Sequence, residues 1–360
     1  MPPEISNMGM DTCSHGGIYS ADHRLVRIDC SSNVNPLGPP ARAISAIKRN
    51  ARALVPRYPD PQCSALKRSL ARYLGIDPDW ITVGNGAVEV IYWFAQAFAG
   101  KRVVIPAPTF CEYELASRKA GAQVTLVQLR DFELAPDLVI EKAAGADALF
   151  LCNPNNPSGV LATPQVKKII EQVESRTKIL LDECFIELVD DTGKNSMIRL
   201  AGEHDNLVIL RSLTKSFGLA GLRVGYCICN FTLSKILAAK SIPWNVNGLA
   251  QVAGVEALAE KNYLERAGAL IKKERRFLFD RIGRMKMFRP CKSDANFFMI
   301  RLLDGNSTEF RDLFLKKTGI LVRDCSTFTG MGSQHIRVAV RTHRENVLLV
   351  KALESFDRND

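Results

Sequence analysis

The stretch Ser212-Leu-Thr-Lys215-Ser-Phe-Gly-Leu-Ala-Gly-Leu-Arg223-Val-Gly225 places a lysine between hydroxyl residues, ahead of a glycine-rich turn and an arginine. A buried lysine with a lowered pKa forms an imine with an aldehyde readily. Ser212 and Arg223 can hold a phosphate beside that imine, because a guanidinium binds phosphate in a bidentate manner. An aldehyde that carries a phosphate describes pyridoxal 5'-phosphate (PLP). For this spacing alone, a basic surface loop or an acylating serine enzyme stays an alternative.

Length and charge narrow the class of protein. A chain of 360 residues predicts one large or two ordinary domains. The net charge of +10 is spread along the chain without aromatic-interleaved basic runs, so we expect an anionic small ligand rather than a nucleic acid. No apolar run approaches the ~20 residues of a membrane span, and the start shows no signal-peptide pattern, which predicts a cytoplasmic protein. The scattered cysteines form no CxxC pair, so no metal site is expected.

Apolar runs alternate with amphipathic stretches between about 64 and 330, which predicts a mainly parallel α/β sheet buried on both faces. The predicted strands are 102–106, 122–127, 148–152, 178–182, 207–211 and 223–229. Thr163 is expected to cap a helix that starts at Pro164. A long helical pattern over 264–284, followed by short strands, predicts a smaller C-terminal α+β domain joined near 243–247.

Polar residues follow several of the predicted strands, and in an open α/β sheet the ligand lies beyond the carboxyl ends of the strands. Asp182 ends one strand, and Asn156 and Ser212 follow two others. Asp182 could pair with a pyridinium nitrogen and keep it protonated, while a structural salt bridge or helix cap is the alternative. Asn156, in a turn with Pro157, could donate to a phenolic oxygen, or it could serve the turn alone.

Further candidates lie outside these strand ends. Gly86 and Ala87 stand between a strand and a helix, where backbone N–H groups can approach a phosphate. Phe110 could stack on a flat ring, with core packing as the alternative. Tyr58 could reach a phosphate through its hydroxyl, or anchor its own loop.

Two arginines on C-terminal strand-like segments are candidate anion binders. Arg337 suits bidentate binding of a carboxylate, and Arg323 could bind a second anion. Surface salt bridges are the alternative for each.

Taken in chain order, these motifs resemble the fold-type I PLP enzymes of the class I/II aminotransferase superfamily, over almost the whole chain. The resemblance implies that Lys215 forms the imine with PLP and acts as general acid and base. The cofactor contacts it implies are Gly86, Ala87, Phe110, Asn156, Asp182, Ser212, Lys215, Arg223 and Tyr58. Tyr58 would reach across from a second subunit, which implies a homodimer.

The resemblance also implies the architecture. We expect a mixed, mainly parallel seven-stranded sheet in a large PLP-binding domain at 51–245. Residues 246–360 would form an interdomain helix and a small C-terminal α+β domain. Residues 1–50 would form an N-terminal arm and part of that small domain.

Within the superfamily the chain is similar to two branches, the threonine-phosphate decarboxylases and the histidinol-phosphate aminotransferases. The start His15-Gly16-Gly17, the phenylalanine at 185 and the segment 243–247 favour the decarboxylase branch. That branch implies PLP-dependent decarboxylation of L-threonine O-3-phosphate, for the nucleotide loop of cobalamin. Amino transfer to or from histidinol phosphate in histidine biosynthesis is the alternative. The substrate contacts implied by the resemblance are His15, Gly16, Asn33, Asn156, Arg323 and Arg337, with Arg337 on the α-carboxylate and Arg323, His15, Gly16 and Asn33 around the phosphate.

Overall fold

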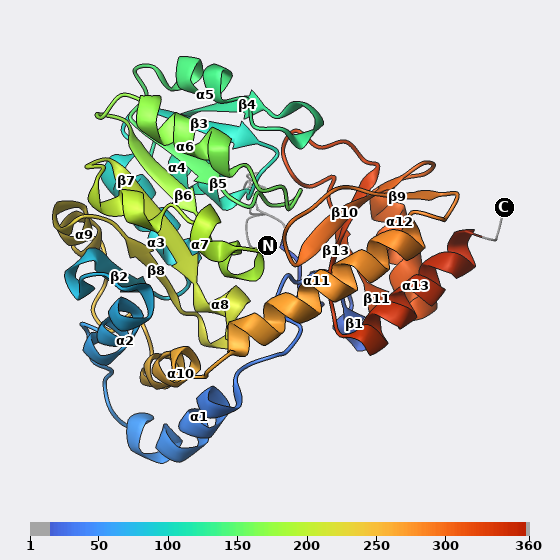
Figure 1. Cartoon of the computed structure of the whole chain (residues 1–360), viewed down its shortest axis with the longest axis horizontal. Helices are drawn as coiled ribbons and strands as arrows, with labels where there is room; N and C mark the ends of the chain where they lie inside the picture. The colour runs from blue at the N-terminus through green and yellow to red at the C-terminus, as the bar shows by residue number, and fades with distance from the viewer. Residues whose placement is uncertain (1–14, 358–360) are drawn as a thin grey trace, which may run out of the picture.

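A seven-stranded sheet forms the centre of the larger part of the molecule (Figure 1). The computed structural model describes residues 15–357, so the part of the predicted N-terminal arm before His15 lies outside the described residues. The sheet has the order β2-β8-β7-β6-β5-β3-β4. Its strands are β2 (Ile81–Gly84), β3 (Arg102–Ala107), β4 (Gln123–Gln128), β5 (Ala148–Cys152), β6 (Lys178–Asp182), β7 (Leu207–Ser212) and β8 (Gly225–Ile228).

Strand β8 alone breaks the parallel arrangement. It runs antiparallel to β2 and to β7, whereas β3, β4, β5, β6 and β7 pair in parallel. The predicted mixed, mainly parallel sheet is therefore confirmed.

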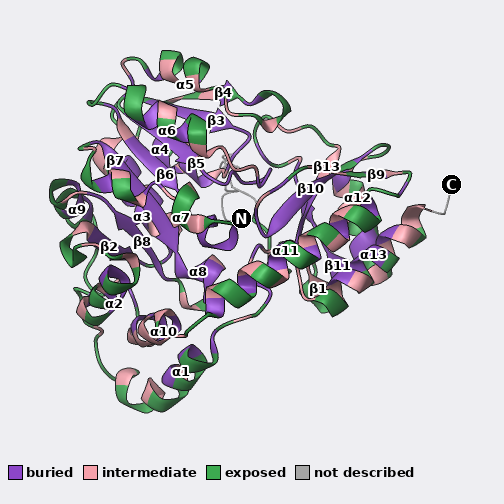
Figure 2. Cartoon of the chain, in the orientation of Figure 1, coloured by how far each residue is buried: buried purple, intermediate pink, exposed green. Residues whose placement is uncertain are grey.

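Alternation along each strand feeds two separate hydrophobic cores. In β5, Leu149 and Leu151 face one cluster, while Ala148 and Phe150 face the other. Helices cover both faces, and Figure 2 shows buried strands between helices whose outer sides are exposed. One face packs against α1 (Ala41–Leu54), α2 (Ser64–Leu74), α5 (Pro136–Ala143), α6 (Thr163–Gln172) and α10 (Gly248–Leu258), and the other against α3 (Ala87–Phe98), α4 (Glu112–Lys119) and α9 (Phe231–Ala238).

The start of α6 differs from the prediction. The helix begins at Thr163 rather than Pro164, so Ala162 occupies the cap position and no side chain caps the helix there. The Thr163 hydroxyl instead donates to Asn195 Oδ1 at 2.9 Å.

The smaller part of the molecule is built on an antiparallel sheet of order β12-β13-β10-β9. Its strands are β9 (Phe288–Pro290), β10 (Phe297–Leu302), β12 (Arg323–Asp324) and β13 (His335–Ala339). The helices α11 (Tyr263–Ile282), α12 (Ser307–Thr318) and α13 (His343–Asp357) pack on it, and α11 runs from the large part to the small one (Figure 1). The fold class, with its smaller C-terminal α+β part, is confirmed.

An early and a late segment of the described chain pair in this smaller part. Strand β1 (Ile28–Asp29) pairs in parallel with β11 (Ile320–Leu321). The helix α10, beyond the predicted boundary at 245, joins the core of the large part through Ala250 and Ala253. The domain boundaries themselves stay a prediction.

The remaining elements are short. They are α7 (Thr192–Asn195), α8 (Leu213–Ser216) and the 3-10 helices Ile18–Ser20, His23–Leu25, Pro78–Trp80, Arg130–Phe132, Ile186–Leu188, Ile198–Gly202 and Ala220–Leu222. Across residues 15–357 no helix is long and apolar enough to cross a membrane. The same residues contain no cluster of histidine, cysteine, aspartate and glutamate suited to a metal ion.

Candidate active site

A cavity of about 300 Å³ lies at the carboxyl ends of the central strands, lined from both parts of the molecule. Most of the residues singled out in the sequence line it together. They are His15, Gly16, Asn33, Ala87, Phe110, Asn156, Asp182, Ser212, Lys215, Arg223, Arg323 and Arg337. One cavity thus collects side chains that are up to 322 positions apart, from His15 to Arg337.

Two predicted site residues, Gly86 and Tyr58, are not among the residues that line this cavity, although Gly86 lies directly against Arg223, which does line it. Tyr58 is 82% exposed, and its ring lies tilted against that of Trp244 with the centroids 4.7 Å apart. A contact between Tyr58 and the cofactor would therefore require a second subunit, and it stays a prediction.

The loop after β2 and the arginine before β8 form a close-packed anion cradle. Gly86 has φ +83, and a Cβ there would lie 2.5 Å from Arg223 Nη2. A Cβ at Gly225 would lie 2.3 Å from the backbone nitrogen of Ala87, at the start of α3. Only glycines let a guanidinium and a helix N-terminus approach in this way, and both attract a phosphate.

Ser212 completes the cradle at the end of β7. It caps the short helix α8, and its Oγ accepts the backbone N–H of Thr214 at 3.2 Å. The Ser212 and Thr214 hydroxyls contact each other, so two hydroxyls line the cavity beside Lys215.

Asp182 lies at the end of β6 and is 6% exposed. Its Oδ2 accepts the Tyr113 hydroxyl at 2.6 Å, and its Oδ1 accepts the Cys184 backbone N–H at 2.8 Å. Burial raises the pKa of Asp182, while these hydrogen bonds oppose that rise. A cationic ring N–H bound in the cavity would compensate the buried carboxylate.

Lys215 lies within the four-residue helix α8, with its Nζ 6.0 Å from the centre of the Phe185 ring. Burial, together with the positive charges of Arg337 and Arg223, lowers the pKa of Lys215 to about 8. The amine is therefore partly unprotonated near neutral pH, which is the form that attacks a carbonyl.

This shift predicts the labelling behaviour of the apoenzyme. Raising the pH through about 8 frees the Lys215 lone pair, so labelling by trinitrobenzenesulfonate should be half-maximal there. Free Nα-acetyl-lysine, the control, should gain reactivity up to its ordinary pKa of about 10.4. Peptide mass spectrometry at each pH gives the labelled fraction, and a Lys215 profile that follows the free amino acid would contradict the prediction.

Arg337 and Arg323 occupy opposed positions on β13 and β12. They are 5% and 4% exposed, so neither of them forms a salt bridge at the surface, which was the alternative interpretation. Arg337 donates to Asn156 Oδ1 through Nη1 and to the Ser31 carbonyl through Nη2 at 2.9 Å. Burial lowers the pKa of Arg337 to about 10. The cavity thus holds two guanidinium groups side by side.

Polar groups near these arginines lack partners. Among the described residues, Arg337 Nε and Asn33 Oδ1 are buried without a hydrogen bond. Burying an unpaired polar group costs free energy. A bound polar substrate would satisfy both.

Several lining residues carried no predicted role. Cys184, Thr214 and Phe328 line the cavity, and Tyr113 binds Asp182 directly. Tyr113 stands three positions after Phe110, a helical spacing that puts both side chains on one side of the chain. That spacing is the one sequence signal that could have revealed Tyr113.

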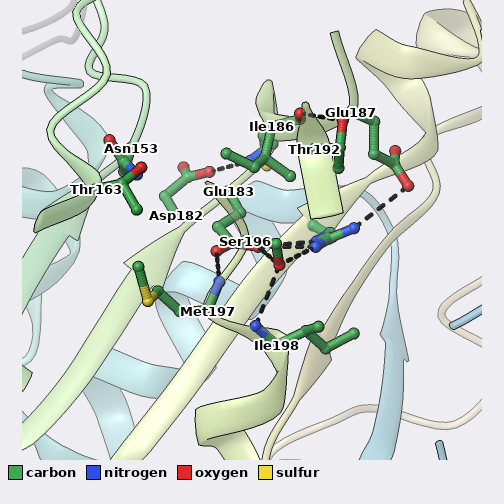
Figure 3. Close-up of polar contacts among 12 residues, drawn as sticks. Asn153, Thr163, Asp182, Glu183, Ile186, Glu187, Thr192, Ser196, Met197 and Ile198 are labelled. Carbon is green, nitrogen blue, oxygen red and sulfur yellow. Dashed lines mark hydrogen bonds and ion pairs between the residues drawn. The ribbon is translucent and has the colours of Figure 1, made fainter. Parts of the chain in front are cut away.

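A buried ion network lies next to the site, among residues that do not line the cavity (Figure 3). Glu183 follows Asp182, and Arg211 precedes Ser212, so alternation turns this pair away from the cavity. Arg211 Nη2 donates to Glu183 Oε2 at 2.8 Å, and Nη1 donates to Glu187 Oε1 at 3.4 Å. The network ties the carboxyl ends of β6 and β7 together.

Arg211→Met should lower the free energy of unfolding by about 3–5 kcal/mol, because it leaves a buried carboxylate unpaired. Urea unfolding followed by circular dichroism measures the change. Arg176→Met is the control, since Arg176 pairs with Glu174 at the surface, where a pair contributes at most about 1 kcal/mol. Equal stabilities of the two variants would contradict the prediction.

The residues of the cavity fit PLP. A cradle that a Cβ would fill suits a phosphate, a lysine of lowered pKa suits an aldehyde, and a buried carboxylate suits a pyridinium nitrogen. Fold and site together define a fold-type I PLP-dependent enzyme.

Comparison with known proteins gives the family. The model for aminotransferase class I and II matches residues 27–353, so the chain belongs to this PLP-dependent family. A relative from Caldanaerobacter subterraneus subsp. tengcongensis, named "Putative threonine-phosphate decarboxylase", is 36% identical over 353 residues, which cover 96% of this chain and 95% of that protein. A histidinol-phosphate aminotransferase from Symbiobacterium thermophilum is also 36% identical, over 92% of this chain and 91% of its own.

A solved structure shares the fold. The histidinol-phosphate aminotransferase from Clostridium acetobutylicum superposes with a TM-score of 0.87 at 30% identity, over 92% of this chain and all of that one. The relatives therefore carry two chemistries on one architecture, and the family alone does not choose between them.

Proposed function

We propose that this chain decarboxylates L-threonine O-3-phosphate to (R)-1-amino-2-propanol O-2-phosphate and CO2. The observation that carries the proposal is the pair of buried arginines, Arg337 and Arg323, which line the cavity from adjacent strands. A substrate with an α-carboxylate and a distal phosphate supplies one anion for each. The decarboxylase relative supports the same choice.

Each group in the cavity then has a task. Bound PLP supplies an electron sink for the bond that breaks at the substrate's α-carbon. Arg337 binds the α-carboxylate, and Arg323, with His15, Gly16 and Asn33, binds the phosphate and holds the substrate tilted. Lys215 delivers a proton to the α-carbon after CO2 has left, which its lowered pKa suits.

The partners and the setting belong to the same proposal. We infer a homodimer in which Tyr58, exposed and in contact with Trp244, reaches the cofactor of the second subunit. The product would serve the nucleotide loop of cobalamin, in the cytoplasm. Sedimentation of the purified protein at twice the mass of 39.9 kDa would support the dimer.

The direct test is one incubation of the PLP-loaded enzyme with L-threonine O-3-phosphate. Release of CO2 and formation of aminopropanol phosphate, without any keto acid, is expected. Histidinol-phosphate aminotransferase activity is the second candidate, because a relative of that function is equally identical. Amino transfer that needs 2-oxoglutarate, with no CO2, would favour that second candidate.

Arg323→Ala should raise KM for L-threonine O-3-phosphate by about 10- to 100-fold, because a charge-assisted contact to the phosphate is lost. Steady-state kinetics of CO2 release measures the change. Arg301→Ala is the matched control, since Arg301 lies exposed on the same sheet. An unchanged KM in the Arg323 variant would remove this residue from the phosphate site.

A further inference from the structure

A buried carboxylate joins the start of the described chain to α4. His15 Nε2 lies 2.8 Å from Glu112 Oε1, and the Tyr92 hydroxyl donates to Glu112 Oε2 at 3.0 Å. The Glu112 side chain is 8% exposed, whereas that of His15 is 50% exposed. The hydrogen bond with His15 lowers the pKa of Glu112, which keeps the carboxylate charged at neutral pH. Glu112 is thus held on both oxygens.

Of the pair His15 and Glu112, only His15 lines the cavity. Within residues 15–357, the cavity lining includes His15 but not Glu112 or Tyr92. Glu112 therefore reaches the cavity through the imidazole ring. A carboxylate that holds one nitrogen of an imidazole fixes the orientation of the ring, as it does for histidines that bind metals.

The backbone of this segment is held from the opposite side. Arg323 Nη1 donates to the His15 carbonyl at 3.1 Å, and the Gly17 N–H donates to Ser31 Oγ at 2.8 Å. A Cβ at Gly16 would lie 2.5 Å from the Ser31 carbonyl oxygen, so the segment lies directly on the neighbouring chain. His15 is consequently placed between α4 and β12, beside the Arg323 guanidinium.

We propose that Glu112 is a positioning residue for the substrate's phosphate. It holds His15 beside Arg323, so that an imidazolium and a guanidinium together bind a dianionic phosphate monoester. With both ring nitrogens protonated, Nε2 donates to Glu112 and the second nitrogen is a donor for the anion. The inference rests on the proposed function in one respect, that the substrate carries a phosphate.

The test compares the PLP-loaded wild-type enzyme with Glu112→Gln. The variant keeps the shape and an acceptor oxygen, but it loses the charge that holds His15. KM for L-threonine O-3-phosphate should rise about tenfold, with kcat and the melting temperature little changed. The dissociation constant of L-threonine, which has no phosphate, should stay as in the wild type.

Two further variants sharpen the result. Glu114→Gln is the matched control, because Glu114 lies on the same helix and pairs with Arg118 at the surface. It should leave both affinities unchanged. Tyr92→Phe removes one hydrogen bond from Glu112 and should raise KM for the phosphorylated amino acid about threefold. This variant serves as the test if Glu112→Gln fails to fold.

The outcomes separate this inference from the proposed function. Equal weakening of the phosphorylated and unphosphorylated amino acids would overturn it, because Glu112 would then only fasten the segment. A wild type that does not distinguish the two ligands would overturn it too. Calorimetry gives the affinities without turnover, so phosphate-selective, Glu112-dependent binding with no CO2 release would reject the decarboxylase and retain the positioning role.

Discussion

Lys215→Ala should reduce turnover by roughly 10⁴-fold, the loss expected when a general acid and base is removed. The variant also lacks the amine, of pKa about 8, that attaches the cofactor. Two readouts are needed, because a misfolded protein would also be inactive. Single-turnover assays give the rate, and borohydride treatment followed by peptide mapping shows whether the cofactor becomes fixed to the chain.

A surface lysine provides the control for Lys215→Ala. Lys194→Ala removes an exposed lysine near the cavity's supporting network, and its activity should match the wild type. Fixation of the cofactor to the Lys215→Ala chain would show that another amine attaches it. Activity within an order of magnitude of the wild type would exclude Lys215 as the acid and base.

Asp182→Asn should lower kcat by about 10²–10³-fold, because the amide cannot hold a proton on the cofactor's ring nitrogen by charge. The substitution keeps the size of the side chain and an oxygen that can accept from Tyr113 or Cys184. It also removes a buried carboxylate whose pKa burial raises, so the fold should not suffer. The expected defect is therefore in kcat rather than in stability.

Stopped-flow kinetics and thermal unfolding check this separation. Asp190→Asn is the control, since Asp190 pairs with Lys272 at the surface. Tyr113→Phe removes one hydrogen bond to the same carboxylate and should cost far less than Asp182→Asn. A kcat for Asp182→Asn close to that of Asp190→Asn would rule out a role at the ring nitrogen.

The sheet and most of the candidate site could be predicted from the sequence, because both leave patterns in short stretches of the chain. Continuous apolar runs such as 148–152 predicted buried parallel strands, and polar residues at their ends marked the cavity. Lys215 and Arg223 lie on one short segment, so the sequence alone could assign both of them to the same site.

What the sequence did not predict depends on contacts between distant segments. The contact of Glu112 with His15 joins positions 97 apart, and Tyr113 reaches Asp182 across 69 positions. No periodicity encodes such pairs. The prediction that Thr163 caps α6 was wrong for a related reason. The Thr163 hydroxyl donates to Asn195, a residue 32 positions away, and this contact competes with capping.

The pairing of β1 with β11 has a consequence for synthesis of the chain. Ile28 leaves the ribosome early, but its partner Ile320 is made among the last residues. The large sheet closes once β8 has emerged, whereas the strand that follows His15 must wait for most of the chain. A nascent chain stalled before residue 320 would therefore hold a finished cofactor cradle without a completed substrate pocket.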